Sequence, residues 1–131
     1  MDKIKTLLII TITFLISSCS SDTTEKLGNG YFFRNEGSLI KDILCESPKG
    51  GEIPATVVEY VYDNKFIIAK QMPKIPQDPL YEKTYNYPNG NDQYYYWIIL
   101  KESNTVFGPL SINKLDSMRA EYNIPKTLKL K

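Results

Sequence analysis

Residues 56–71, TVVEYVYDNKFIIAKQ, decide the fold of this 131-residue chain. Two runs rich in Val, Ile, Tyr and Phe flank Asp63 and Asn64, which tolerate positive φ, so the segment predicts a β-hairpin with a two-residue loop. That loop would pair Tyr60 with Ile67. Apolar side chains would then lie on both faces of the hairpin, which indicates that neither face is open to water.

The segments on either side of the hairpin continue the strand pattern. Residues 94–101 carry apolar side chains on both faces and predict a central strand, and residues 105–107 predict the next strand, ended by Gly108-Pro109. Residues 31–33 and 38–44 predict two earlier strands joined by a turn that contains glycine.

A single helix is predicted after the last strand. Ser111 suits an N-cap, and apolar residues recur at helical spacing as far as Tyr122, before Pro125 ends the helix. The expected fold is therefore α+β, an antiparallel sheet of about five or six strands, formed as a meander of hairpins, with one C-terminal helix packed on one face. The other apolar face would be covered by residues 72–93 or by a partner.

The N-terminus has the order of a secretory signal. Lys3 and Lys5 precede the apolar residues 7–16, and Ser17-Ser18-Cys19 follow. The apolar run is well short of the roughly 20 residues that span a bilayer. The stretch resembles a bacterial lipoprotein signal with its lipobox, which implies a signal peptide over residues 1–18 and lipid attachment, with palmitate among the acyl chains, at Cys19. A short buried helix is the alternative.

The remaining chain has the size of one domain. Residues 19–29 predict a polar tether that begins at the lipidated cysteine, and residues 30–131 predict a single globular α+β domain. The first 18 residues hold two of the 16 basic and one of the 15 acidic residues, so the rest has 14 of each. A net charge near zero argues against nucleic acid as a partner.

The chain contains no histidine. This excludes Ser-His-Asp and Cys-His nucleophiles, and Cys45 alone can form neither a tetrathiolate zinc site nor a disulfide once Cys19 carries lipid. We therefore expect no enzyme activity, no metal and no cofactor. Carboxylate-pair chemistry stays open, with a pool of candidate residues: Glu59, Asp63, Asp78, Glu82 and Asp92.

Residues 72–93 form a long, proline-rich connection that includes Tyr81, Tyr85 and Tyr87. Connections of this length are often functional, and tyrosine is enriched in recognition surfaces, so the three tyrosines are a candidate binding surface. The alternative is a lid in which they pack against the sheet. Residues 89–92 predict a tight turn rather than a calcium loop, because they offer one carboxylate.

Several of these segments together resemble an uncharacterised family of short bacterial lipoproteins. They are Val58-x-Tyr60-x-Tyr62-Asp63, Phe66 to Gln71, Tyr96-Trp97-Ile98-Ile99, Gly108-Pro109-Leu110 and Ile124-Pro125. The resemblance implies this fold and an envelope location, and it carries no catalytic residue.

The predicted function is a non-enzymatic binding module, inhibitor-like or immunity-like, held at the membrane by its lipid and open to a protein partner in the envelope. The alternative is an envelope hydrolase that uses two carboxylates. Ser20 and Ser21 do not resemble an inner-membrane retention signal, which favours the periplasmic leaflet of the outer membrane in a Gram-negative cell. Surface display and the oligomeric state stay open.

Overall fold

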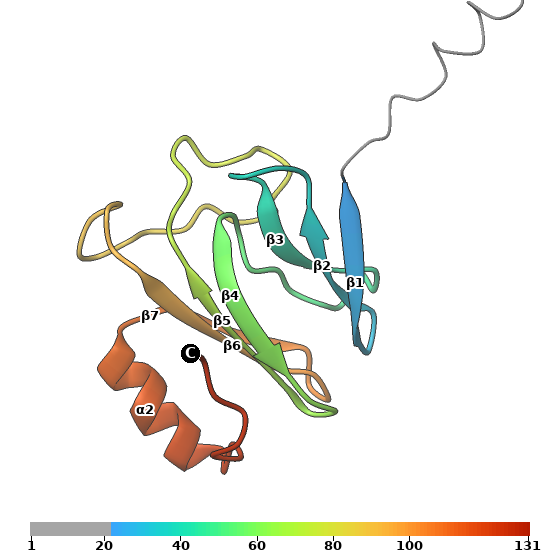
Figure 1. Ribbon diagram of the computed structural model, residues 1–131, viewed down its shortest axis with the longest axis vertical. Helices are drawn as coiled ribbons and strands as arrows, with labels where there is room; N and C mark the ends of the chain where they lie inside the picture. The colour runs from blue at the N-terminus through green and yellow to red at the C-terminus, as the bar shows by residue number, and fades with distance from the viewer. Residues whose placement is uncertain (1–21) are drawn as a thin grey trace, which may run out of the picture.

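The computed structural model describes residues 22–131, so Cys19 and the predicted signal peptide lie outside the described residues. These residues form two antiparallel sheets and one helix (Figure 1). The first sheet contains β1 (Thr23–Gly28), β2 (Tyr31–Asn35) and β3 (Lys41–Cys45). The second contains β4 (Val57–Tyr62), β5 (Phe66–Gln71), β6 (Tyr95–Leu100) and β7 (Thr105–Leu110), and α2 (Ile112–Glu121) follows. The predicted α+β class, the antiparallel meander and the C-terminal helix are confirmed, with the strands divided between two sheets.

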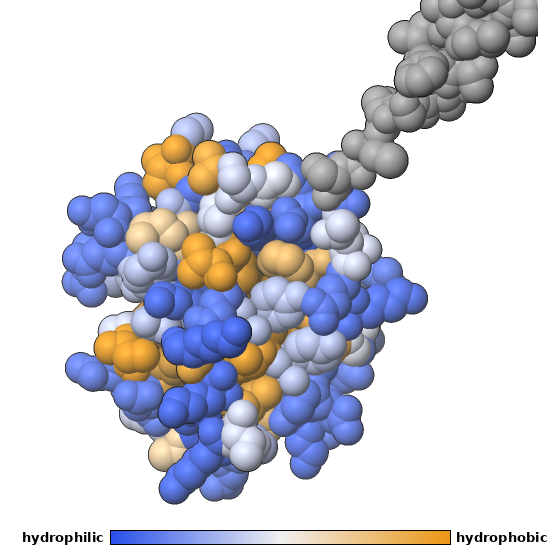
Figure 2. Space-filling model, viewed as in Figure 1, coloured by the Kyte–Doolittle hydropathy of each residue, from blue (hydrophilic) through white to orange (hydrophobic). Residues whose placement is uncertain are grey.

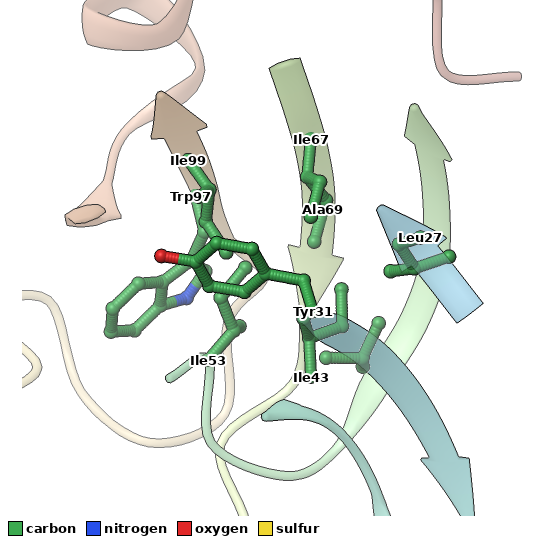
Figure 3. Close-up of a cluster of buried hydrophobic side chains, with 9 residues drawn as sticks. Leu27, Tyr31, Ile43, Ile53, Ile67, Ala69, Trp97 and Ile99 are labelled. Atoms are coloured by element: carbon green, nitrogen blue, oxygen red, sulfur yellow. The ribbon is translucent and has the colours of Figure 1, made fainter. Parts of the chain in front are cut away.

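The β4–β7 sheet is the middle of three layers. One face packs against the β1–β3 sheet, and the other packs against α2 and the C-terminal tail (Figure 1). The cluster between the sheets, shown in Figure 3, consists of Leu27, Tyr31, Ile43, Ile53, Val57, Ile67, Ala69, Trp97 and Ile99. The cluster under the helix consists of Ile68, Ile98, Leu115, Met118, Ile124 and Leu128. Neighbouring residues of β5 and β6 thus serve different clusters, as the two-faced apolar pattern predicted.

The β4–β5 hairpin has a wider turn than the sequence predicted. Tyr60 pairs with Ala69 instead of Ile67. The reason is Asp63, whose Oδ1 accepts hydrogen bonds of 2.8 Å from the backbone N–H groups of Lys65 and Phe66. The register shift is two residues, so from Glu59 onward each side chain keeps its predicted face.

A bulge changes the first residues of β4. The register shifts between Val57 and Glu59, which places Val57 in the core between the sheets and leaves Val58 47% exposed. A bulge adds one residue to a strand and reverses the alternation beyond it. This is why Val57 lies on the face opposite to the one that simple alternation predicts.

The predicted tether at residues 19–29 is wrong over most of its length, because Thr23–Gly28 forms β1. Its one large apolar side chain, Leu27, is 1% exposed and belongs to the core between the sheets. The Lys101 ammonium group donates a hydrogen bond to the Leu27 carbonyl. β1 is an edge strand whose other side chains remain in water, so the stretch has the composition of a linker.

The C-terminal region follows the prediction closely. Ser111 caps α2 by accepting a 3.2 Å hydrogen bond from the Lys114 backbone N–H. The Arg119 guanidinium donates to the carbonyls of Pro125 and Leu128, at 3.1 and 2.6 Å, which fixes the tail so that Leu128 is buried. Within residues 22–131, α2 is too short and too polar to cross a bilayer.

Candidate functional site

The connection over residues 72–93 does not present Tyr81 to solvent. Tyr81 is buried, and its hydroxyl donates to Asp42 Oδ2 at 2.6 Å and accepts from the Ala55 N–H at 2.9 Å. Burial, followed by the hydrogen bond to Asp42, raises the pKa of the Tyr81 phenol. Arg34 forms a bidentate ion pair with the same carboxylate, in which Nε donates to Oδ1 at 3.0 Å and Nη2 donates to Oδ2 at 2.6 Å. Tyr81 therefore holds the connection against the sheets from inside, and it is not part of the recognition surface that the sequence predicted.

Tyr87 also points inward. The fully buried Gln71 amide donates from Nε2 to the Tyr87 hydroxyl at 2.9 Å and to the Ala55 carbonyl at 3.3 Å. Its Oε1 accepts from the Trp97 indole N–H at 2.7 Å. The end of the connection is thus tied to the middle sheet through a buried amide whose donors and acceptor are satisfied.

Tyr85 is half-buried and borders a cleft. Its ring packs edge-on against Trp97, with ring centroids 5.2 Å apart and planes at 84°. Burial raises the pKa of the Tyr85 hydroxyl, and the neighbouring Glu52 carboxylate adds to the shift. Of the three predicted tyrosines, Tyr85 is the one that lines a hollow of the surface.

The cleft has a volume of about 470 Å³ and lies between residues 48–52, the connection and the β6–β7 hairpin. A volume of this size suits a small ligand or one side chain of a partner. Its characteristic lining residues are Glu52, Glu82, Tyr85, Trp97, Asn104 and Val106. The floor is the indole of Trp97, with Gly108 beside it.

Glu52 is the electrostatic centre of this cleft. Burial is the main cause that raises the pKa of its carboxyl group, and the nearby Glu82 carboxylate adds to it. The Glu82 backbone N–H, 3.0 Å from Oε1, and the Tyr85 hydroxyl act in the opposite direction. Oε2 is buried and has no partner that meets hydrogen-bond geometry among residues 22–131, and the one side-chain donor beside the carboxyl group is the Tyr85 hydroxyl that lowers its pKa. A buried acceptor without a donor is rare in folded proteins, so a ligand with an N–H or O–H group fits this position.

The cleft brings together only part of the carboxylate pool. Glu82 lines it, whereas Asp63 caps the β4–β5 turn and Asp78 accepts from the Leu80 N–H at 2.9 Å in a separate turn. Glu59 binds the backbone N–H of Lys131, and Asp92 is exposed beside another turn. Glu52 was not among the carboxylates predicted from the sequence. Its position directly after Gly50-Gly51, where backbone can approach other elements closely, is a signal that could have identified it.

The other two sequence candidates have structural roles. Cys45 is half-buried, and its Sγ occupies the space that a Cβ at Gly50 would need, at 2.2 Å. At residues 89–92, the Tyr95 hydroxyl accepts from the Asn89 N–H and donates to the Gly90 carbonyl, at 2.9 and 2.8 Å, which closes the predicted tight turn. No group of three or more acidic or cysteine side chains is placed to hold a metal in the part of the chain that the structure describes.

A second hollow, of about 420 Å³, carries the opposite charge. It lies between α2, the tail and the middle sheet, and its cationic side chains are those of Lys70, Arg119, Lys126, Lys129 and Lys131. Arg119 is already engaged in holding the tail, and the three lysines of the tail are exposed. Because solvent satisfies exposed ammonium groups, the acidic cleft with its unsatisfied carboxylate oxygen is the better candidate site.

Comparison with known proteins gives one relationship. No curated protein and no solved structure shows a significant match to the chain. A family model, described as a protein of unknown function (DUF3997), matches residues 33–131, a range that includes every residue of the acidic cleft. This match spans most of the sequence, and the chain therefore belongs to the DUF3997 family of proteins of unknown function.

Proposed function

We propose that this protein is a lipid-anchored binding module of the bacterial cell envelope, and that its acidic cleft accepts a cationic side chain of a protein partner. The observation that carries the proposal is Glu52 Oε2, a buried carboxylate oxygen that meets no hydrogen-bond donor among residues 22–131, in a cleft large enough for one side chain. An inhibitor or immunity protein would work in this way, by occupying a surface of its target without chemistry.

The chemistry of the cleft supports a cation. Glu52 and Glu82 supply two carboxylates, and the Tyr85 ring offers a face on which an ammonium or guanidinium group can stack. Lys49 and Lys83 also line the cleft, but both are exposed, as Glu82 is, so solvent screens these three charges and the buried oxygen of Glu52 dominates the interior of the cleft. An entering cation would give Oε2 its missing donor and would favour the ionised form of Glu52.

The anchor is proposed to be Cys19, which carries acyl chains after removal of residues 1–18. A single acyl chain binds membranes marginally, whereas two or three chains at about 0.8 kcal/mol per buried methylene hold a protein stably. In cells that express the full chain, Cys19→Ser should move the protein from the detergent-extracted membrane fraction to the aqueous fraction. If the variant still requires detergent for extraction, lipidation at Cys19 is refuted.

One observation favours a second candidate function, which is hydrolysis by a carboxylate pair. Glu52, with its raised pKa, would act as the general acid, and Glu82 would act as the base or nucleophile. This candidate places both carboxylates in the same cleft but needs a substrate held between them. Binding alone requires less of the site, and we therefore rank it first.

The two functions separate by substitution of Glu52. Trp97 is the only tryptophan of the chain and lines the cleft, so its fluorescence reports occupancy. Titration of the full chain in detergent micelles with N-acetyl-arginine amide should give a saturable change, and Glu52→Gln should weaken binding by at least about tenfold. The substituted amide keeps an oxygen that can accept from the Glu82 N–H, so the loss of binding reports charge. Glu121→Gln on α2 is the control and should leave binding unchanged.

Two other outcomes would decide against this proposal. A parent chain without any fluorescence change on titration would refute cation binding in the cleft. Turnover of envelope glycans that is abolished by either Glu52→Gln or Glu82→Gln would establish the hydrolase instead.

A further inference from the structure

Three aliphatic side chains are exposed at one end of the domain. Leu39, Ile75 and Leu80 are 60%, 54% and 56% exposed, and we call them the anchor-end cap. Figure 2 shows hydrophobic surface along the upper edge of the molecule.

Strand pairing places Leu39 at the end where the described chain begins. Thr23, the first residue of β1, pairs with Asn35, and Asn35 pairs with Lys41. The turn between β2 and β3, which carries Leu39, therefore extends past the start of β1 (Figure 1).

Hydrogen bonds bring Ile75 to the same end. Thr56 donates from Oγ1 to the Leu39 carbonyl at 2.6 Å, and its backbone exchanges two bonds of 2.9 Å with Met72. The Lys74 N–H then bonds to the Ala55 carbonyl at 3.1 Å, directly before Ile75.

Leu80 is placed by its neighbour in the chain. The Tyr81 hydroxyl bonds to Asp42 in β3 and to the Ala55 N–H, so residue 80 lies close to the same row of backbone. The connection after β5 passes over this end of both sheets in Figure 1. The anchor-end cap thus gathers side chains from two separate loops at one end of the domain.

The lipid attachment proposed above is separated from this end of the domain by few residues of chain. Cys19 is four residues before Thr23, and four extended residues reach at most about 14 Å. Thr23 is therefore held within about 14 Å of the membrane surface. Interfacial apolar side chains are buried roughly 5–10 Å deep, so side chains at this end of the domain are near enough to reach the lipid.

We propose that the anchor-end cap inserts into the lipid interface, so that the anchored domain lies on the membrane in one orientation. The inference rests on the lipid anchor of the proposed function. Once the acyl chains are inserted, contact of the cap with lipid is an intramolecular event at high effective concentration. Three partly exposed side chains then suffice for a stable orientation that they would not give to a free protein.

A lipid surface explains the cap better than a protein partner does. Protein interfaces depend on Trp, Tyr and Arg anchors, whereas this cap consists of aliphatic side chains on two loops. The β4–β5 and β6–β7 turns, at the other end of the strands, would face away from the membrane.

The test uses the full chain in vesicles of phosphatidylethanolamine and phosphatidylglycerol (3:1) that contain a nitroxide lipid. In a Cys45→Ser background, an environment-sensitive fluorophore is attached at Ser38→Cys, next to Leu39, or at Ser103→Cys, in the β6–β7 turn at the opposite end. Both are exposed serines, which makes them a matched pair. We expect the label at 38 to be quenched and its emission to shift to the blue, and the label at 103 to show neither change.

A second variant isolates the cap itself. Leu39→Ser, Ile75→Ser and Leu80→Ser together should leave the chain folded and floating with the vesicles, because Cys19 still holds it, and should abolish quenching at position 38. Equal, water-like emission at 38 and 103 on a floating protein would overturn insertion and leave the anchor intact. Blue emission at 38 without nitroxide quenching would show that the label packs against the domain itself or a second copy of the chain, and would overturn the lipid surface. A chain that does not float would refute the anchor, and the inference with it.

Discussion

Gly108 lies against the indole of Trp97 so closely that a Cβ at residue 108 would come within 2.3 Å of the ring atoms Cδ2 and Cε3. The sequence predicts that a strand ends at Gly108, whereas β7 continues through it to Leu110. A glycine is needed at residue 108 because the indole at the floor of the cleft occupies the space that any side chain there would fill.

Gly108→Ala should destabilise the protein by about 1–3 kcal/mol, the usual cost of overpacking a core, and should disturb the Trp97 fluorescence. The measurement is urea unfolding followed by far-UV circular dichroism. Gly37→Ala is the matched control, since Gly37 also has positive φ but has no atom within 4 Å of the new Cβ. Equal losses in the two variants would show that backbone strain, and not the indole, is responsible.

Trp97→Ala and Ile98→Ala should each cost about 2–5 kcal/mol, because both side chains are buried and each belongs to a different cluster. Chemical denaturation of each variant and of the parent gives the values. Val58→Ala, at a residue left exposed by the β4 bulge, should change stability by less than about 0.5 kcal/mol. If Trp97→Ala and Ile98→Ala melt like the parent, the middle layer is placed wrongly.

Tyr81→Phe should cost about 1–3 kcal/mol, since it leaves the buried Ala55 N–H without an acceptor and takes one donor from Asp42. Tyr94→Phe, at an exposed tyrosine, is the control. Limited proteolysis within residues 72–93 should accelerate only in the Tyr81 variant. Unchanged stability and unchanged cleavage would mean that the connection is not held by this hydroxyl.

Glu52 should make stability depend on pH. Because its pKa is raised above the ordinary value of 4.5 in the folded state, the folded protein binds this proton more tightly than the unfolded chain does. Its stabilising contribution is therefore complete below pH 4.5 and is lost as the pH rises through the folded-state pKa. The difference in unfolding free energy between the parent and Glu52→Gln, measured from about pH 4 to about pH 8, should shift in favour of the variant. A constant difference over that range would contradict a raised pKa of Glu52 in the folded state.

The strands that could be predicted are those in which the alternation of side chains along the segment itself determines how the strand packs. Residues 94–101 have apolar side chains on both faces. β6 therefore lies in the middle layer, where the first sheet covers one face and the helix covers the other. Leu27 could not be found in this way. One apolar residue in a polar stretch gives no periodicity. β1 forms because β2 pairs with its backbone, while Lys101 and the core between the sheets hold Leu27.

The candidate site depends even more on distant contacts. The prediction of a lid over the sheet, the alternative to a recognition surface, describes Tyr81 and Tyr87, whose hydroxyls find buried partners. Glu52 acquires its raised pKa chiefly from burial in a cleft that is lined in part by the connection, about 30 residues further along the chain. No local pattern encodes that approach. Lipidation of Cys19 stays a prediction.

The hydrogen bond from Lys101 to the Leu27 carbonyl has a consequence for folding kinetics. Every ladder joins consecutive strands, and the longest loop that a ladder closes is the connection between β5 and β6. The bond from Lys101 to Leu27 joins residues 74 positions apart. Because closure of the longest loops carries the greatest entropic cost, we expect docking of the first sheet on the second to follow the local hairpins and to limit the folding rate. Leu27→Ala should slow folding by nearly the whole of its effect on stability, with a φ-value well above that of Leu115→Ala under the helix.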